Sequence, residues 1–161
     1  MDILTLTLNP CVDRTLWPDG SVELQSGGKG INVARVLSNL GVDCLALAPV
    51  GGRGGEIFRD LTYAEGIALA PFPIRGNTRT IDTYVGAGYG QRVVREPSPS
   101  MSPEELEGLE GRALELLARG PRAFCVCGSA CSEEAAGLVG AKLLRKAKEM
   151  GIHTLLDANG P

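Results

Sequence analysis

Short apolar runs alternate with amphipathic segments along most of this chain. The runs are typical of strands buried on both faces of a sheet, and the segments between them repeat apolar residues at helical spacing. Strands are predicted over residues 3–8, 44–50, 67–72, 124–127 and 154–156. Helices are predicted over residues 30–40, 56–64, 102–119 and 132–150. This order predicts an α/β fold with a mostly parallel sheet and right-handed crossovers, and its final strand suggests an unfinished sheet.

Residues 78–96 depart from this alternation. Two β-rich runs flank a glycine-rich turn there, which predicts a hairpin inserted between the α/β elements. We find neither an internal repeat nor a linker, so residues 1–161 are treated as one unit.

Composition excludes several classes of function. With 43% apolar residues, 22% charged residues and a formal net charge of -3, the chain has an ordinary globular composition and no basic block. We therefore expect neither a nucleic-acid nor a membrane partner. The apolar stretch at the start is too short for a signal peptide, so a cytoplasmic protein with reduced cysteines is expected.

The cysteines do not indicate a metal site. Cys125, Cys127 and Cys131 form C-x-C-x-x-x-C, which lacks the paired spacing of structural zinc sites. The single histidine, His153, is distant in sequence. No metal ligand is predicted, and Cys125 and Cys127 are interpreted as buried thiols of one strand.

The stretch "SGGKGINVARVL" leads from a glycine loop into a predicted helix. It lacks the upstream glycine of a Walker loop, and Gly30 stands where that motif needs Ser or Thr. The spacing of a dinucleotide fingerprint is also missing. Two interpretations remain: a ligand loop whose helix N-terminus and Asn32 contact the ligand, or a tight turn with a solvent-facing Lys29.

Several stretches together resemble a known family. In chain order they are "TLNPCVDRT", "SGGKGINVARVLSNLGV", "VGGRGGEIFRDLTYAEGI", "NTRT", "CGS" and "LLDANG". They resemble the N-terminal half of the PfkB family of sugar kinases, in its 1-phosphofructokinase and tagatose-6-phosphate kinase branch. The resemblance implies a partial ribokinase-like three-layer sandwich with a small β lid. It also implies phosphoryl transfer from ATP, with Mg²⁺, to a hydroxyl of a ketohexose phosphate.

The resemblance assigns substrate-binding roles by matched position. Asp13 resembles the carboxylate that holds sugar hydroxyls, Asn32 a second hydroxyl contact, and Arg79 the arginine that grips the substrate's phosphate, which suits its planar guanidinium. The remaining expected substrate-binding residues are Gly27, Gly28, Lys29 and Ser129.

Some residues depart from the family pattern. The family usually has a longer stretch between the positions of Asp13 and Gly27, which supplies lid strands. Here only "RTLWPDGSVELQS" joins these residues, so a shortened lid with part of it missing is expected. The family's asparagine after "TRT" is absent, since Ile81 and Asp82 follow, and Asp82 would repel a substrate phosphate if it pointed inward. The other arginines of this region are expected to be exposed lid charges: Arg75, Arg92 and Arg95.

The second half of the family carries the nucleotide site and a G-A-G-D motif whose aspartate is the catalytic base. Family members are roughly twice as long as this chain, so we expect that C-terminal half to be absent here. The stretch "GAGY" at residues 86–89 is not that motif, because it has tyrosine in place of the base and lies in the lid. No catalytic or nucleotide-binding residue is assigned. Three hypotheses remain: the sugar-binding half of a kinase that is inactive alone, a non-catalytic sugar-phosphate-binding module, or an inactive truncated product. Homodimerisation or self-association through the lid or the open sheet edge is a further expectation.

Overall fold

A computed structural model describes residues 1–86, 90–132 and 135–158. Within these residues a five-stranded parallel sheet has the order β5-β4-β1-β8-β9. Its strands are β1 (Ile3–Leu6), β4 (Cys44–Val50), β5 (Leu69–Pro73), β8 (Ala123–Cys127) and β9 (His153–Asp157). The predicted parallel sheet is confirmed.

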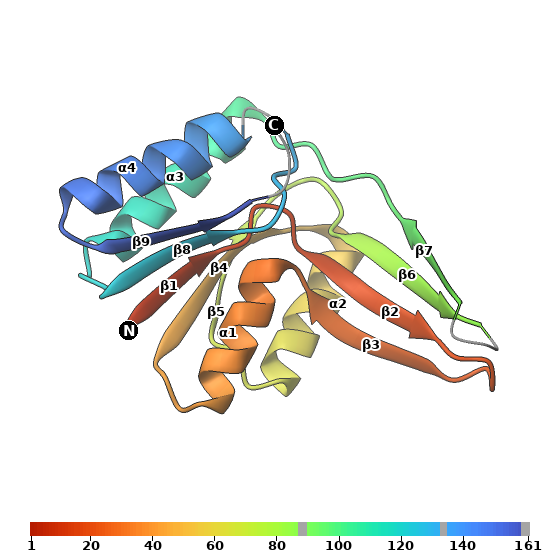
Figure 1. The fold of residues 1–161 in the computed structure, drawn as a ribbon. Coiled ribbons are helices and arrows are strands. Elements are labelled where there is room, and N and C mark those ends of the chain that lie inside the picture. The colour runs from red at the N-terminus through yellow and green to blue at the C-terminus, as the bar shows by residue number, and fades with distance from the viewer. Residues whose placement is uncertain (87–89, 133–134, 159–161) are drawn as a thin grey trace.

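Helices cover both faces of this sheet, as Figure 1 shows. They are α1 (Lys29–Asn39) and α2 (Gly52–Ala64) on one face, and α3 (Pro103–Leu117), the π-helical segment η1 (Ala135–Ala141) and α4 (Lys142–Glu149) on the other. Leu4, Leu6 and Phe124 pack toward α3 and α4, whereas Ala46 and Ala48 pack toward α1 and α2. The central strands are therefore buried on both faces, which explains their continuous apolar sequences.

The helix starts follow local chemistry. Ser102 caps α3 by accepting a hydrogen bond from the Glu105 backbone, and Glu105 accepts one from the Ser102 backbone in return, as its sequence predicts. Helix α2 begins earlier than expected, at Gly52, because Asn77 accepts a hydrogen bond from the Gly54 N–H of its first turn at 2.9 Å. The predicted helix over residues 132–150 contains η1 and α4, with residues 133–134 outside the described part.

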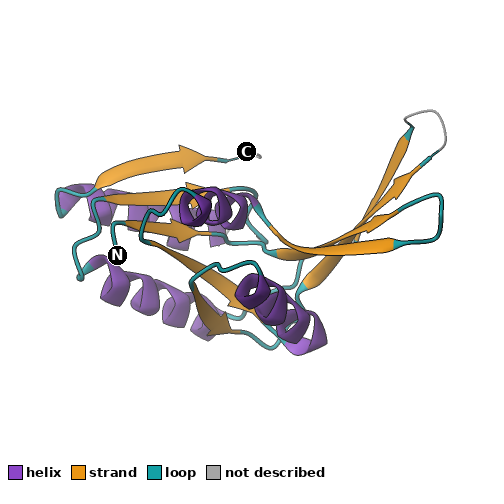
Figure 2. Cartoon of the chain, turned by 90° about the horizontal axis from the view of Figure 1, so that it is seen from below, coloured by secondary structure: helices purple, strands orange, loops and turns teal. Residues whose placement is uncertain are grey.

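A second sheet forms the lid and projects from the body, as Figure 2 shows. In the order β3-β2-β6-β7 its described strands are β3 (Val22–Gly27), β2 (Cys11–Leu16), β6 (Arg79–Val85) and β7 (Gln91–Arg95). The predicted hairpin is β6 and β7. The stretch from Asp13 to Gly27, where part of the lid was expected to be missing, contributes to β2 and β3, which pair along their whole length. Of "GAGY", residues 87–89 lie outside the described part.

None of the helices in the described ranges is both long and apolar enough to cross a membrane.

Candidate functional site

The sheet topology places a crevice beside β1. From β1 the chain first builds outward through β4 to β5, and later returns to place β8 on the other side of β1. The direction in which strands are added therefore reverses between β1 and β8, which makes this a topological switch point. In open parallel sheets, ligands bind at the carboxyl ends of the strands at a switch point. The residues that follow β1 and β8 line a cavity of about 280 Å³ there.

Most of the predicted substrate-binding residues line this one cavity: Asp13, Gly28, Lys29, Asn32, Arg79 and Ser129. The lid supplies Asp13 and Arg79, the first turns of α1 supply Lys29 and Asn32, and the end of β8 supplies Ser129. Sequence reasoning missed the other lining residues: Thr7, Asn9, Cys11, Ile81, Arg95, Cys127 and Gly128. The "TLNP" and "CGS" stretches contain several of these and were the available signal.

Unsatisfied polar atoms gather at this cavity. Among the described residues, four buried side-chain atoms have no hydrogen-bond partner, and three of them belong to lining residues: Thr7 Oγ1, Asn9 Oδ1 and Arg79 Nε. A buried polar atom without a partner costs about 1–3 kcal/mol, so such atoms are rare in folded proteins. Their gathering around one hollow is typical of a site that takes a polar ligand.

Two glycines precede α1 beside the cavity: Gly28 lines it, whereas Gly27, also predicted to bind substrate, does not. Gly28 precedes α1 with φ 113°, a left-handed conformation that favours glycine. Gly27 allows a close approach, because a Cβ atom there would lie 2.3 Å from Asp13 Oδ2. Within the described residues no side-chain hydrogen bond caps α1, and this helix begins at Lys29, which lines the cavity.

Lys29 lies at the cavity and also connects it to the last strand. Its Nζ is 2.9 Å from Asp157 Oδ1 at the end of β9, and the Gly128 N–H donates to the Asp157 carbonyl at 2.7 Å. Sequence reasoning treated Lys29 as an added positive charge and did not pair it with Asp157. This ion pair joins the glycine loop to the end of the edge strand β9.

The carboxylate of Asp13 is half-buried beside a thiol. Burial raises the pKa of Asp13, while a hydrogen bond from Cys11 Sγ at 3.4 Å and the positive charges of Arg35 and Arg79 lower it. Burial and the neighbouring Asp13 raise the pKa of Cys11 to about 12. Cys11 is therefore a neutral hydrogen-bond donor to Asp13 and a poor nucleophile.

Two expectations about charged lid residues change. Asp82 does not face the cavity: its neighbour Ile81 lines it, and Asp82 binds Arg14 through two hydrogen bonds of 2.8 and 2.5 Å on the opposite face of the lid. Arg14 holds the pKa of Asp82 below its usual value, so the repulsion that its sequence suggests does not arise. The expectation for Arg95 was incomplete, because this exposed arginine also lines the cavity.

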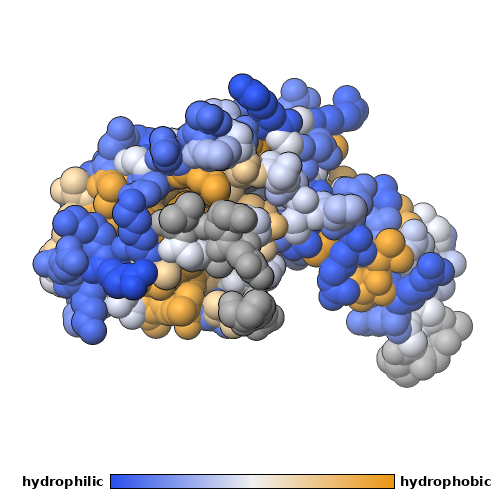
Figure 3. Space-filling model, turned by 90° about the horizontal axis from the view of Figure 1, so that it is seen from above, coloured by the Kyte–Doolittle hydropathy of each residue, from blue (hydrophilic) through white to orange (hydrophobic). Residues whose placement is uncertain are grey.

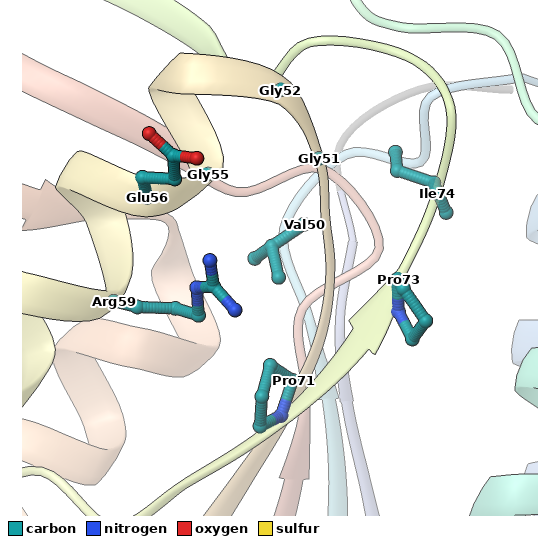
Figure 4. A pocket seen from close by; sticks show the side chains of 9 residues that line it. All are labelled: Val50, Gly51, Gly52, Gly55, Glu56, Arg59, Pro71, Pro73 and Ile74. Atoms are coloured by element: carbon teal, nitrogen blue, oxygen red, sulfur yellow. The ribbon is translucent and has the colours of Figure 1, made fainter.

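A larger hollow of about 390 Å³ lies between α2 and β5, where Arg59 extends toward Val50 (Figure 4). Its ionisable side chains, Glu56 and Arg59, are exposed, and no unsatisfied buried atom of a described residue lines it. The unsatisfied buried atoms therefore favour the cavity of about 280 Å³ as the candidate functional site. The described residues contain no cluster of three or more His, Cys, Asp or Glu side chains that could hold a metal ion.

Comparison with known families agrees with this geometry. The family model described as pfkB family carbohydrate kinase matches residues 1–161. The chain belongs to the pfkB family. A tagatose-6-phosphate kinase from Staphylococcus epidermidis is 33% identical over 98% of this chain and 53% of its own length. The ATP-dependent 6-phosphofructokinase isozyme 2 of Escherichia coli is 28% identical over 98% of this chain and 54% of its own length.

Solved structures confirm the ribokinase-like fold of this pfkB-family chain. Phosphofructokinase-2 of Escherichia coli in complex with fructose-6-phosphate matches 98% of the chain and 55% of its own with a TM-score of 0.83 and 27% identity. A possible 1-phosphofructokinase from Thermotoga maritima gives a TM-score of 0.85 at 23% identity, covering 98% of this chain and 53% of its own, which shows the fold alone. The chain spans about half the length of the curated relatives it matches.

Proposed function

We propose that this chain forms the sugar-phosphate-binding half of an ATP-dependent kinase that phosphorylates a hydroxyl of a ketohexose phosphate. Asp13 accepts hydrogen bonds from sugar hydroxyls, and the carboxamide of Asn32 makes a second hydroxyl contact. Arg79 donates to the phosphate already on the sugar, aided by the charge of Lys29 and by the N-terminus of α1. Gly27 and Gly28 form the floor, and Ser129 contributes a hydroxyl from the end of β8.

The observation that carries this proposal is the composition of the cavity. One carboxylate, positive side chains and an uncapped helix N-terminus converge around three unsatisfied polar atoms. A polyhydroxylated ligand with one anionic group matches these features, since each hydroxyl can both donate and accept. The names of the relatives, tagatose-6-phosphate kinase and 6-phosphofructokinase, support the same substrate class.

Phosphoryl transfer needs more than substrate binding. It requires in-line placement of the phosphoryl donor, a group that orients the attacking hydroxyl, and cations for the developing charge. We propose that ATP, Mg²⁺ and the catalytic base belong to a C-terminal half corresponding to the part of the relatives that this chain does not span. This chain would then hold and orient the acceptor sugar without turning it over.

Isothermal titration calorimetry of the chain with fructose 6-phosphate, fructose 1-phosphate and tagatose 6-phosphate tests the binding proposal, with unphosphorylated fructose as the reference. We expect saturable binding of at least one sugar phosphate. Arg79→Ala should weaken it roughly 10- to 100-fold, the effect of losing hydrogen bonds to a charged group. Arg92→Ala is the matched control, because Arg92 is an exposed lid arginine that does not line the cavity. Equal losses in both variants, or no binding by the parent chain, would contradict the proposal.

A coupled ADP-release assay separates the catalytic from the non-catalytic interpretation. We expect no turnover above background when the isolated chain is mixed with MgATP and a sugar phosphate that it binds. Robust turnover would overturn the proposal that the nucleotide site and the base lie in another half.

A further inference from the structure

Arg35 on α1 contacts the residue that begins the glycine turn and one side chain that lines the cavity. Its Nη1 donates to Asn32 Oδ1 at 2.6 Å, and its Nη2 donates to Ser26 Oγ at 3.0 Å and to the Ser26 carbonyl. Ser26 directly precedes Gly27 and Gly28. One guanidinium therefore holds both the entry to the glycine turn and the side chain of Asn32.

Glu65, at the end of α2, completes this network. Its carboxylate accepts from Arg35 Nη2 at 2.8 Å, from the Ser26 N–H at 2.8 Å and from Ser26 Oγ at 2.5 Å. Ser26 is fully buried, and the side chains of Arg35 and Glu65 are only 17% and 19% exposed. Ion pairs on the exposed surface contribute little to stability. When an ion pair is largely buried, removing one member leaves the charge of the other buried without a partner.

The contact with Arg35 also decides how Asn32 is oriented. A guanidinium has only donors, so the Asn32 carboxamide must present its oxygen to Arg35. Its NH₂ group is then left to donate to a ligand. Asn32 lines the cavity, and this orientation makes it complementary to Asp13, which only accepts when it is ionised.

From these contacts we infer that Arg35 and Glu65 are positioning residues of the sugar-phosphate site, which fix the turn from Ser26 to Gly28 and the donor orientation of Asn32. This inference rests on the proposed function for its ligand. Neither residue lines the cavity, so both act through Ser26, Asn32 and Asp13.

Arg35 also contributes to the ionisation of Asp13. The groups that act on Asp13 are Cys11 on its own strand, Arg79 on β6 and Arg35 on α1, and Lys29 and Arg95 line the same cavity. Burial raises the pKa of Asp13, and Arg35 lowers it. Removing the charge of Arg35 should therefore raise the pKa of Asp13 further. Asp13 would then lose its negative charge at a higher pH.

Nuclear magnetic resonance of the chain tests this inference without any ligand. The probes are the ¹³C chemical shift of the Asp13 carboxyl during a pH titration and the ¹⁵N–¹H signals of the Asn32 carboxamide. In Arg35→Gln we expect the Asp13 midpoint to move to higher pH and the Asn32 signals to move toward those of a solvated amide. Arg35→Lys should restore much of the Asp13 midpoint, because it keeps the charge, but not the Asn32 signals, because a lysine lacks the guanidinium fork.

Arg112→Gln is the matched control. Arg112 pairs with Glu115 at 2.8 Å, the same distance as the pair of Arg35 and Glu65, but on the exposed surface of α3. Its loss should leave both probes unchanged. Glu65→Gln keeps the shape of the Glu65 side chain and leaves Arg35 in place. It should disturb the amide signals of Gly27 and Gly28, so this variant tests the inference if Arg35→Gln does not fold. Parent-like spectra in both Arg35→Gln and Glu65→Gln would overturn the inference.

Calorimetry with fructose 6-phosphate then links the network to the ligand. We expect Arg35→Gln to weaken binding about tenfold, the effect of misplacing one or two hydrogen bonds, and Arg112→Gln to leave it unchanged. If the parent chain binds no sugar phosphate, the proposed function fails, while the ligand-free titration still decides the role of Arg35. If the parent binds and Arg35→Gln binds equally well, the positioning role is refuted and the proposed function stands.

Discussion

Asp13 is placed where its ionisation opposes folding stability. Burial raises its pKa above the ordinary value, so ionising this carboxylate is less favourable in the folded chain than in the unfolded chain. The penalty is fully present above the folded pKa and fades as the pH falls toward the unfolded value. Cys11, Arg35 and Arg79 reduce this penalty without removing it.

Asp13→Asn should therefore stabilise the free chain at neutral pH while it loses affinity for sugar phosphates. Asparagine keeps the shape and the acceptor for Cys11, but it has no charge to bury. Urea unfolding of both proteins at neutral pH and in acid measures the effect, and the gain should shrink as the pH falls through the folded pKa of Asp13. A variant less stable than the parent at neutral pH would contradict this account.

Gly27→Ala should disturb the same carboxylate from the other side. The new Cβ would lie 2.3 Å from Asp13 Oδ2 and 2.6 Å from Cys11 Sγ, so both side chains must move. We expect a loss of about 1–3 kcal/mol in the free energy of unfolding, typical of overpacking, together with weaker sugar-phosphate binding. Calorimetry and urea unfolding of one preparation measure both. Parent-like binding would show that the position of Asp13 does not matter.

Sequence reasoning found residues whose chemistry is local or matches a family motif, and missed those defined by their neighbours in space. Asp13, Asn32 and Arg79 stand in motifs that the resemblance covers. Glu65 was missed because it binds Ser26 across 39 positions of sequence, and nothing local marks a glutamate at a helix end as a partner of a glycine loop. Arg95 reaches the cavity only because β7 pairs with β6.

At the scale of elements, the lid shows which strands a hydrophobic pattern cannot reveal. The first four residues of β3 are exposed, so no continuous apolar run predicts this strand. What forms the hairpin is the turn between β2 and β3, where Trp17 N–H donates to the Ser21 carbonyl at 3.0 Å and Gly20 has φ 84°. The body strands β1, β4 and β8 were predictable because they are buried, whereas β2 and β3 are held mainly by pairing.

Helix α3 allows two substitutions with opposite expected effects on stability. Ser102→Ala removes the side chain that caps the Glu105 N–H and should lower the free energy of unfolding by about 1 kcal/mol. Gly111→Ala should raise it by roughly 0.5–1 kcal/mol, because the glycine is inside the helix and an added Cβ meets nothing within 4 Å. Urea unfolding measures both. Since neither residue lines the cavity, sugar-phosphate affinity should stay at the parent value, and a change would indicate coupling between α3 and the site.

At the scale of the whole molecule, the two edges of the body sheet differ. The edge strand β5 contains Pro71 and Pro73, which have no N–H to offer to another strand. The edge strand β9 has no proline, and its neighbouring residues Leu155 and Leu156 are 55% and 62% exposed. Because adjacent residues of a strand point to opposite faces, apolar surface is uncovered on both faces of β9.

Apolar surface is therefore exposed along β9, and it also interrupts the hydrophilic surface in Figure 3, on the body and on the lid. On the lid the exposed apolar residues include Val22, Leu24, Tyr84 and Val94. Either surface is available for self-association of this chain. If the chain works together with the proposed C-terminal half, contact with that half would replace the self-association.

Leu156→Lys distinguishes the two surfaces. A lysine on an edge strand opposes pairing with another edge, so we expect the parent chain to associate with rising concentration in sedimentation velocity and this variant to associate less. Leu40→Lys is the control, because Leu40 is 71% exposed at the end of α1 and belongs to neither β9 nor the lid strands. If the variant associates as strongly as the parent, the lid rather than β9 carries the contact. A parent chain that stays monomeric at every concentration would show that the exposed leucines of β9 do not drive association.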